Sequence, residues 1–308
     1  MRIYVTGAIG FVGGWLLAEL RQSGHTVVPA PGPEEMDITD RDALMRWLGG
    51  PSGPPEAIVH LAGIAFPLDA KDDPTEAFRV NVGGTVALFE ALHQVGIRPA
   101  VLVSGSSEVY GQPRSQDLPL TESAPLGPNG PYALSKIAQE AAAIEASARY
   151  GFPVVVTRSF NHAGPGQRPV FVVPAMARRV AAMRRGELTC IPAGNVDVRR
   201  DLTDVRDVVR AYRLLLELSA GTAPASRVVN VASGVAVSIR SIIEQLCELA
   251  GVQPRIQFDE SLARADDPVE IYGDASLLTE CTGWLPEIPL RRTLIDILAE
   301  ASDIVVSR

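Results

Sequence analysis

Short apolar runs alternate with longer amphipathic stretches through the first half of the chain. Runs rich in Val, Ile and Leu are typical of strands that are buried on both faces, and apolar residues spaced three and four apart are typical of helices. The predicted strands are Ile3–Thr6, Thr26–Pro29, Ala57–Leu61, Ala100–Ser104 and Val154–Arg158. The helices predicted between them are Phe11–Ser23, Asp40–Leu48, Pro74–Val95 and Tyr132–Tyr150. This alternation predicts an α/β fold with a Rossmann-type, doubly wound parallel sheet.

The pattern changes after about Phe160, where loops become longer and richer in proline and glycine. The elements predicted there are the helices Asp204–Leu218, Ser238–Leu249, Ala275–Thr282 and Leu290–Ala301, and the strands Val228–Val231 and Arg255–Phe258. We therefore expect a first domain over 1–160, to which later segments at roughly 196–215 return, and a smaller C-terminal α/β domain over 161–308.

Composition narrows the kind of partner and the compartment. The formal net charge of −8 argues against nucleic acid, because phosphate backbones bind to basic surfaces. No apolar stretch approaches the roughly 18 residues that a membrane span needs, and the first strand begins without a leader pattern. Three widely spaced cysteines are expected to be reduced thiols. These observations predict a cytoplasmic protein without a membrane partner, and they include no metal-ligand pattern.

Glycines follow the first predicted strand at a regular spacing, as Gly7, Gly10 and Gly13. A tight turn and a close approach of backbone N–H groups to a pyrophosphate both require positions without side chains, and the following helix N-terminus favours an anion. The motif predicts dinucleotide binding. The end of the second strand, Val28–Pro33, carries neither the acid that reads a ribose hydroxyl nor the arginine that reads a 2′-phosphate, so NAD(H) and NADP(H) both stay open.

Further motifs occur in a fixed order along the chain and resemble those of extended short-chain dehydrogenases/reductases, the NAD-dependent epimerase/dehydratase family. They are Thr6–Gly13 (TGAIGFVG), Asp37-Ile38, His60–Gly63 (HLAG), Asn81–Thr85 (NVGGT) and Tyr132–Lys136 (YALSK). The third departs from the usual HLAA at Gly63. The resemblance implies cofactor contacts from the following residues: Gly7, Gly10, Phe11, Val12, Asp37, Ile38, Leu61, Ala62, Gly63, Tyr132 and Lys136.

Later segments are most similar to the GDP-4-dehydro-6-deoxy-D-mannose reductases within that family. These segments are Ser106–Gly111, Arg158–Gln167, Arg200–Asp207, Val229–Gly234 and Thr282–Pro286. The resemblance implies reduction of a GDP-linked keto-sugar at C4, a nucleotide-sugar-binding C-terminal domain, and a homodimer formed through the helices near 74–95 and 132–150. It also implies substrate contacts from Ser107, Asn161, Val172, Arg178, Arg200 and Arg264.

The catalytic residues are expected around Tyr132 and Lys136, which lie one helical turn apart on a shared face. A lysine cation is expected to stabilise the phenolate and so to lower the pKa of the phenol. The family resemblance assigns the catalytic hydroxyl to Ser106, with Ser104 and Ser107 as competitors. It also places Glu108 in the site, either as a base for water elimination or as a residue that orients the sugar.

Two other functions remain open from the sequence. A nucleotide-sugar 4-epimerase or 4,6-dehydratase uses the same triad but returns the hydride to the sugar, so that no net cofactor is consumed. A non-catalytic dinucleotide-sensing protein can share the fold, because a fold alone does not establish catalysis.

Overall fold

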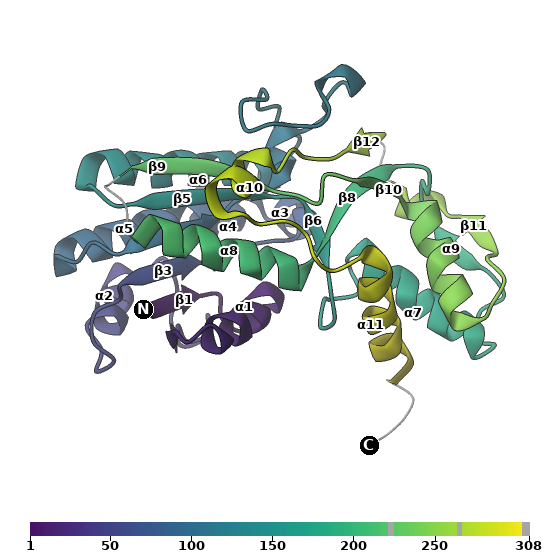
Figure 1. Ribbon diagram of the computed structural model, residues 1–308, viewed down its shortest axis with the longest axis horizontal. Coiled ribbons are helices and arrows are strands. Elements are labelled where there is room, and N and C mark those ends of the chain that lie inside the picture. The colour runs from purple at the N-terminus through teal and green to yellow at the C-terminus, as the bar shows by residue number, and fades with distance from the viewer. Residues whose placement is uncertain (221–224, 264–266, 304–308) are drawn as a thin grey trace.

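The computed structural model describes residues 1–220, 225–263 and 267–303. Its largest feature is a six-stranded sheet whose neighbouring strands all run parallel (Figure 1). In spatial order the strands are β2 (Thr26–Pro29), β1 (Arg2–Thr6), β3 (Ala57–His60), β4 (Ala100–Ser104), β5 (Val154–Ser159) and β9 (Ser226–Val231). The chain turns to one side after β1 to form β2 and to the other side to form β3. Ligands of such sheets bind beyond the carboxyl ends of the strands at this switch point.

Helices cover both faces of the large sheet, which confirms the predicted doubly wound fold. The helices are α1 (Phe11–Gln22) and α8 (Val205–Ala220) on one face, and α2 (Arg41–Leu48), α5 (Gly84–Val95) and α6 (Pro131–Tyr150) on the other. Successive residues of β1 serve opposite cores: Ile3 and Val5 pack toward α1 and α8, whereas Tyr4 packs toward α2 and α5. All three side chains are fully buried, which explains why the strands read as continuous apolar runs.

A second group of elements lies beyond one end of the large sheet, at the right of Figure 1. Its strands are β6 (Asn161–Ala163), β7 (Ile191–Ala193), β8 (Arg199–Asp204), β10 (Ala236–Ser238), β11 (Ile256–Phe258) and β12 (Glu270–Ile271). Its helices are α7 (Val172–Arg184), α9 (Ile239–Ala250) and α11 (Leu290–Asp303), which share one apolar core. The division into 1–160 and 161–308 stays a prediction, since α8 and β9 follow residue 160 and yet belong to the layers of the large sheet.

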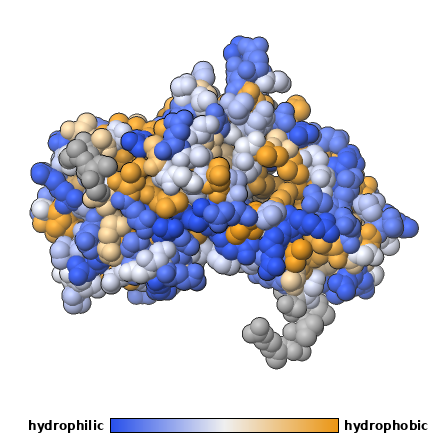
Figure 2. Space-filling view, in the orientation of Figure 1, coloured by the Kyte–Doolittle hydropathy of each residue, from blue (hydrophilic) through white to orange (hydrophobic). Residues whose placement is uncertain are grey.

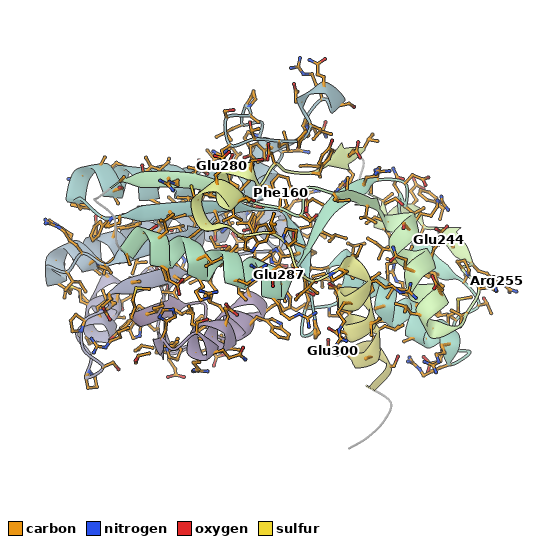
Figure 3. The ribbon with its side chains drawn as sticks, viewed as in Figure 1. Phe160, Glu244, Arg255, Glu280, Glu287 and Glu300 are labelled. Atoms are coloured by element: carbon orange, nitrogen blue, oxygen red, sulfur yellow. The ribbon has the colours of Figure 1, made fainter. Side chains whose placement is uncertain are left out.

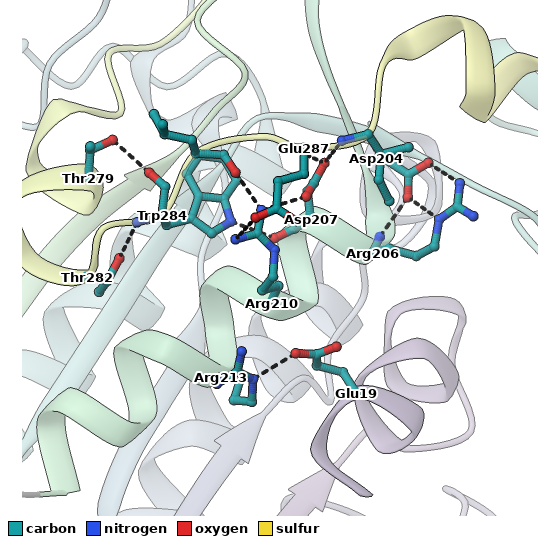
Figure 4. A network of polar contacts seen from close by, with 12 residues as sticks. Glu19, Asp204, Arg206, Asp207, Arg210, Arg213, Thr279, Thr282, Trp284 and Glu287 are labelled. Carbon is teal, nitrogen blue, oxygen red and sulfur yellow. Dashed lines mark hydrogen bonds and ion pairs between the residues drawn. The ribbon is translucent and has the colours of Figure 1, made fainter. Parts of the chain in front are cut away.

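Buried carboxylates join the C-terminal segment to the end of β8 and to α8 (Figure 4). Asp207 accepts hydrogen bonds from the backbone N–H groups of Glu287 and Ile288, at 3.1 and 2.8 Å. Asp204 accepts one from the hydroxyl of Thr293 on α11, at 2.7 Å. Buried carboxylates are stable only when such donors satisfy them. Asp204 and Asp207 therefore fix the C-terminal segment against β8 and α8.

One predicted helix, Pro74–Val95, contains a break in its regular hydrogen bonding. The structure has α4 (Pro74–Phe78), a π turn over Arg79–Gly83, and then α5. A π turn carries one extra residue and so changes the direction of the side chains around it. Asn81 lies in this turn with its side chain fully buried. The helical period of the sequence did not reveal this local change.

Two long elements after residue 160 escaped the sequence prediction. Helix α7 contains Pro174 and several arginines, which weaken its apolar pattern. Strand β8 has the sequence RRDLTD, whose residues after the first are nevertheless buried. Its polar side chains are buried because they are paired, for example Arg200 with Asp267 at 2.7 Å. Hydropathy cannot reveal a strand that is buried through polar partners. The remaining short helices are α3 (Pro67–Asp72) and α10 (Ser276–Thr282).

The surface seen in Figure 2 shows apolar side chains in separate patches, with hydrophilic side chains between them. Within the described residues, no helix combines the length and apolar character that a membrane crossing requires.

Candidate active site

The carboxyl ends of the central strands lie level with one another. Thr6 pairs with His60 at the ends of β1 and β3, His60 pairs with Val103, and Ser104 pairs with Thr157 at the ends of β4 and β5. The loops that follow these strands therefore begin at the same edge of the sheet. They carry the glycine motif, the 61–63 segment and the serines at 106 and 107, and Asn161 follows β5 at the start of β6.

The glycine loop after β1 packs against the loop after β3. Gly7 has a φ of +66°, and a Cβ at this position would lie 2.7 Å from both the amide nitrogen of Ala62 and the carbonyl carbon of Leu61. Helix α1 begins at Phe11, and its N-cap Gly10 supplies no side-chain acceptor to the first turn. A cradle without side chains, next to a helix N-terminus with unused donors, fits the pyrophosphate of a dinucleotide.

The residues expected beside the adenine lie between the end of β2 and the π turn. The carboxylate of Asp37 accepts hydrogen bonds from Thr39 and forms an ion pair with Arg79 at 2.7 Å. The hydrogen bond from the Thr39 backbone is the largest influence that lowers the pKa of Asp37, and Arg79 lowers it further. Ile38 is buried against Gly84 at the start of α5. Asp37 is thus a charged, fixed acceptor at neutral pH.

Tyr132 and Lys136 lie on the first turns of α6, and both side chains are buried. The ammonium of Lys136 donates to the carbonyl oxygen of Ser104 at 3.0 Å and to Oε1 of Gln139 at 2.9 Å. It lies 6.0 Å from the centroid of the Tyr132 ring. The loop after β4 and the helix α6 thus hold the cation beside the phenol.

Burial dominates the electrostatics of both groups. It raises the pKa of Tyr132 above its usual value, and a hydrogen bond with Ser106 only partly opposes this shift. Burial also lowers the pKa of Lys136 to about 8. The expected lowering of the phenol pKa is therefore wrong for this geometry, because the loss of hydration outweighs the hydrogen bond with Ser106. Tyr132 is protonated at neutral pH, the state that a proton donor requires.

Ser106 is the serine whose side chain hydrogen-bonds with Tyr132. It also caps the 3-10 turn Ser107–Tyr110, since its Oγ accepts from the backbone N–H of Glu108 at 3.2 Å. Of the two competitors, Ser104 directs its Oγ toward Tyr212 at 3.3 Å, and Ser107 is buried in the turn. The charge of Glu108 raises the pKa of Tyr132, which places this carboxylate near the phenol as well.

A buried ion pair lies next to the 3-10 turn Ser107–Tyr110. Arg158 on β5 donates to both carboxylate oxygens of Glu140 on α6, at 2.9 and 2.6 Å. It also donates to the hydroxyl of Tyr110 at 3.1 Å, which in turn donates to Asn230 at 2.7 Å. The Tyr110 ring stacks on Phe160, which Figure 3 labels near the middle of the molecule between the two groups of elements. The Arg158–Glu140 pair thus fixes the turn that carries Ser106.

Comparison with known proteins shows the family to which the chain belongs. The NAD dependent epimerase/dehydratase family matches residues 3–232, which is most of the chain. The chain belongs to this family. It is 37% identical to the GDP-6-deoxy-D-mannose reductase of Pseudomonas aeruginosa, over 97% of this chain and 96% of that one. It is also 31% identical to the GDP-6-deoxy-D-talose 4-dehydrogenase of Aggregatibacter actinomycetemcomitans, over 92% of each chain.

A solved structure shows the same fold over the whole length. The structure of RMD from Pseudomonas aeruginosa complexed with NADPH superposes with a TM-score of 0.90 at 36% identity, covering 99% of each chain. Family membership, the glycine cradle and this likeness agree on a nicotinamide dinucleotide as the cofactor of this epimerase/dehydratase family member. That relative is complexed with NADPH, and the oxidation of NADPH and of NADH measures the preference of this chain.

The residues that the family resemblance assigns to the substrate come from several elements. Ser107 is buried in the 3-10 turn directly after Ser106. Asn161 is exposed at the start of β6, Val172 begins α7, and Arg178 is exposed on that helix. Arg200 is buried, and its guanidinium donates to Asp267 and to backbone carbonyls. Arg264 lies outside the described residues. These substrate contacts stay predictions.

Sequence reasoning missed several buried polar residues of the site. Tyr212 on α8 hydrogen-bonds with Ser159 at 2.7 Å, and Gln139 hydrogen-bonds with Lys136 on α6. Thr85 contacts both His60 and Gln139. The spacing of three between Lys136 and Gln139 on one helix face was a usable signal for this contact. The others depend on tertiary packing that the sequence pattern does not display.

At Gly63 this chain has glycine in place of the last alanine of the usual HLAA motif, and this difference can be tested by substitution. A Cβ at Gly63 would lie 2.7 Å from Oδ1 of Asn81, which accepts from the Ile64 backbone N–H at 2.8 Å. Asn81 is buried and also donates to Ser135. We expect Gly63→Ala to lower the free energy of unfolding by about 1–3 kcal/mol, as measured by urea denaturation, because the buried amide must move.

The matched control is Gly14→Ala in the exposed part of α1, where an added Cβ meets nothing within 4 Å. This change should leave the stability unchanged or raise it slightly, since alanine is the better helix former. Equal stability of the Gly63→Ala protein and the parent would contradict the close approach at Asn81.

Proposed function

We propose that this chain is an NAD(P)H-dependent reductase that converts the C4 keto group of GDP-4-dehydro-6-deoxy-D-mannose to an alcohol, giving GDP-D-rhamnose or its C4 epimer. The observation that carries the proposal is the buried Tyr132 hydroxyl, which is held protonated beside Lys136 and hydrogen-bonded with Ser106. The likeness to a GDP-6-deoxy-D-mannose reductase and to a structure complexed with NADPH supports the choice of substrate and reaction.

The residues of the site divide the work of such a reduction. The bound dinucleotide supplies a hydride equivalent for C4 of the sugar. Ser106 and Tyr132 hydrogen-bond with each other, so their hydroxyls lie close together. Both can therefore bind the C4 carbonyl oxygen of the sugar in place of this mutual hydrogen bond. Ser106 donates a hydrogen bond to that oxygen as negative charge develops on it. Tyr132 Oη then gives its proton to the oxygen and completes the alcohol.

Lys136 contributes the positive charge that this proton transfer needs. As the proton leaves Tyr132, a phenolate forms in a buried site, where an unpaired anion is costly. Lys136 stabilises it, and its remaining N–H direction beyond Ser104 and Gln139 is suited to a ribose hydroxyl of the dinucleotide. Gly7, Gly10, Phe11 and the 61–63 segment hold the pyrophosphate side in this proposal.

One observation favours a second candidate, a nucleotide-sugar 4,6-dehydratase. Glu108 lies close enough to Tyr132 for its charge to raise the phenol pKa. A carboxylate in this place is what water elimination requires of a base. In the reductase the same residue orients the sugar. The two reactions differ in whether reduced cofactor is consumed.

The proposal also includes an assembly and a place of action. Apolar side chains on the exposed faces of α5 and α6, among them Val86 and Leu134, suit a homodimer through these helices. The cysteines at 190, 247 and 281 are free thiols, which agrees with action in the reducing cytoplasm. The sugar nucleotide would lie between the strand ends and the 161–308 region.

The test is the oxidation of NADPH and of NADH, followed at 340 nm with freshly made GDP-4-dehydro-6-deoxy-D-mannose. We expect one equivalent of reduced cofactor to be consumed for each GDP-deoxyhexose formed. Turnover of a GDP- or UDP-linked sugar without net oxidation of cofactor would instead assign the chain to the dehydratases or epimerases of its family.

A further inference from the structure

A continuous chain of buried polar side chains leads from the end of β1 to the catalytic lysine. Thr6 hydrogen-bonds with Nδ1 of His60 at 2.8 Å, and Nε2 of His60 with Oγ1 of Thr85 at 3.1 Å. Nε2 of Gln139 donates to the same Thr85 oxygen at 3.0 Å, and Oε1 of Gln139 accepts from Lys136 at 2.9 Å. All five side chains are at least nine-tenths buried.

The donor and the acceptor of each hydrogen bond in this series of side chains follow from the number of protons that each group carries. The single hydroxyl proton of Thr85 goes to the carbonyl oxygen of Asn81, at 2.7 Å. Both His60 and Gln139 must therefore donate to the two lone pairs of Thr85. His60 then carries its proton on Nε2 and accepts from Thr6 at Nδ1. This tautomer is neutral, in agreement with a pKa that burial, and next the charge of Lys136, lower to about 3.

This arrangement leaves the Gln139 amide only one orientation. A reversed amide would direct its NH₂ group at the Lys136 ammonium and its oxygen at a hydroxyl whose proton is already used. Both contacts would be repulsive, and burial of these side chains makes such contacts costly. The Gln139 carbonyl oxygen is thus held toward Lys136, and a charge-assisted hydrogen bond of this kind is stronger than one between neutral groups.

We propose that Gln139 is a positioning residue for the reduction, which keeps the Lys136 ammonium charged and directed at the site through a carbonyl that Thr85 and His60 hold in place. The proposal rests on the proposed function for its catalytic meaning. The effect of Gln139 on the protonation and orientation of Lys136 does not depend on the reaction. This effect can therefore be measured without any substrate.

Among the residues that the structure describes, few other charged or titratable groups act on Lys136. Tyr132 faces it from α6, and His60 from β3 is neutral. Glu108 from the 3-10 turn and Tyr212 from α8 act on Tyr132. A change at residue 139 therefore alters the nearest acceptor of the cation and leaves the charges around it in place.

The composition of the chain provides a direct probe, since its only lysines are Lys71 and Lys136. Protein labelled with ¹³C at the lysine ε-carbon should give two NMR signals, and the exposed Lys71 serves as the internal reference. Titration of the second signal reports the proton affinity of Lys136 in the full chain. Gln139→Met removes the acceptor at similar size, and Gln139→Glu replaces it with a carboxylate.

We expect the midpoint of Lys136 to move by about one pH unit, downward in Gln139→Met and upward in Gln139→Glu. The basic limb of kcat/KM for NADPH-dependent reduction should move in the same two directions. Gln245→Met on α9, which removes an amide bonded to Ser241, is the matched control and should leave both profiles in place. A purely structural role would lower the stability of both variants without opposite shifts.

Unchanged midpoints in folded Gln139→Met and Gln139→Glu, or shifts in the same direction, would overturn the proposal. If the methionine variant does not fold, Gln139→Leu removes the same acceptor, and an unchanged Lys136 midpoint in that variant would overturn the proposal. Opposite shifts in the NMR titration, together with no reduction by the parent enzyme, would refute the proposed function and retain the role of Gln139 toward Lys136.

Discussion

Tyr132→Phe should reduce kcat for the keto-sugar by about 10²–10⁴-fold and leave NADPH binding intact. The change removes only the proton that the site holds in readiness, because the ring is buried and keeps its packing. Steady-state rates give the first quantity, and the fluorescence of bound NADPH gives the second.

Tyr150→Phe at the end of the same helix is the matched control. Its ring packs on His93 and Phe152, away from Lys136. It should retain the activity of the parent. A Tyr132→Phe enzyme that reduces the sugar at the parental rate would remove Tyr132 from the mechanism.

Arg158→Met should lower the free energy of unfolding by about 3–5 kcal/mol, because it leaves the Glu140 carboxylate buried without its partner. The side chains of this pair are 6% and 9% exposed, so water does not replace the lost contact. The double variant Arg158→Met/Glu140→Met should recover much of the loss. Urea denaturation measures all three proteins.

A surface pair on the same helix provides the control for this cycle. Arg149 and Glu145 lie 3.6 Å apart with exposed side chains, and exposed pairs contribute little to stability. Arg149→Met should therefore change the stability only slightly. Equal losses from Arg158→Met and Arg149→Met would show that the buried pair has no special part in supporting the 107–110 turn.

The large sheet could be predicted from the sequence because its strands are apolar on both faces. β2 and β4 have the bounds expected for them, and β1, β3 and β5 differ only at their ends. The glycine motif and the YALSK spacing pointed to the edge of the sheet where the structure places both segments. The pattern of apolar residues predicts secondary structure well where the buried side chains are apolar.

The remainder depends on contacts between polar residues that are distant in sequence. β8 is buried through paired side chains, and Asp204 and Asp207 act as acceptors for groups 89 and 81 residues away in the sequence. The raised pKa of Tyr132 follows from burial, which the helix pattern around Tyr132 did not reveal. Propensity and spacing carry no information about such desolvation.

In the proposed reaction, this chain reduces a sugar at C4 with hydride taken from its cofactor. Its most direct test is to supply NADPH deuterated at the transferable position of the nicotinamide, together with GDP-4-dehydro-6-deoxy-D-mannose, and to analyse the sugar product by NMR. We expect one deuterium at C4 of the product for each cofactor oxidised. A product without deuterium, formed while the reduced cofactor stays unchanged, would contradict it.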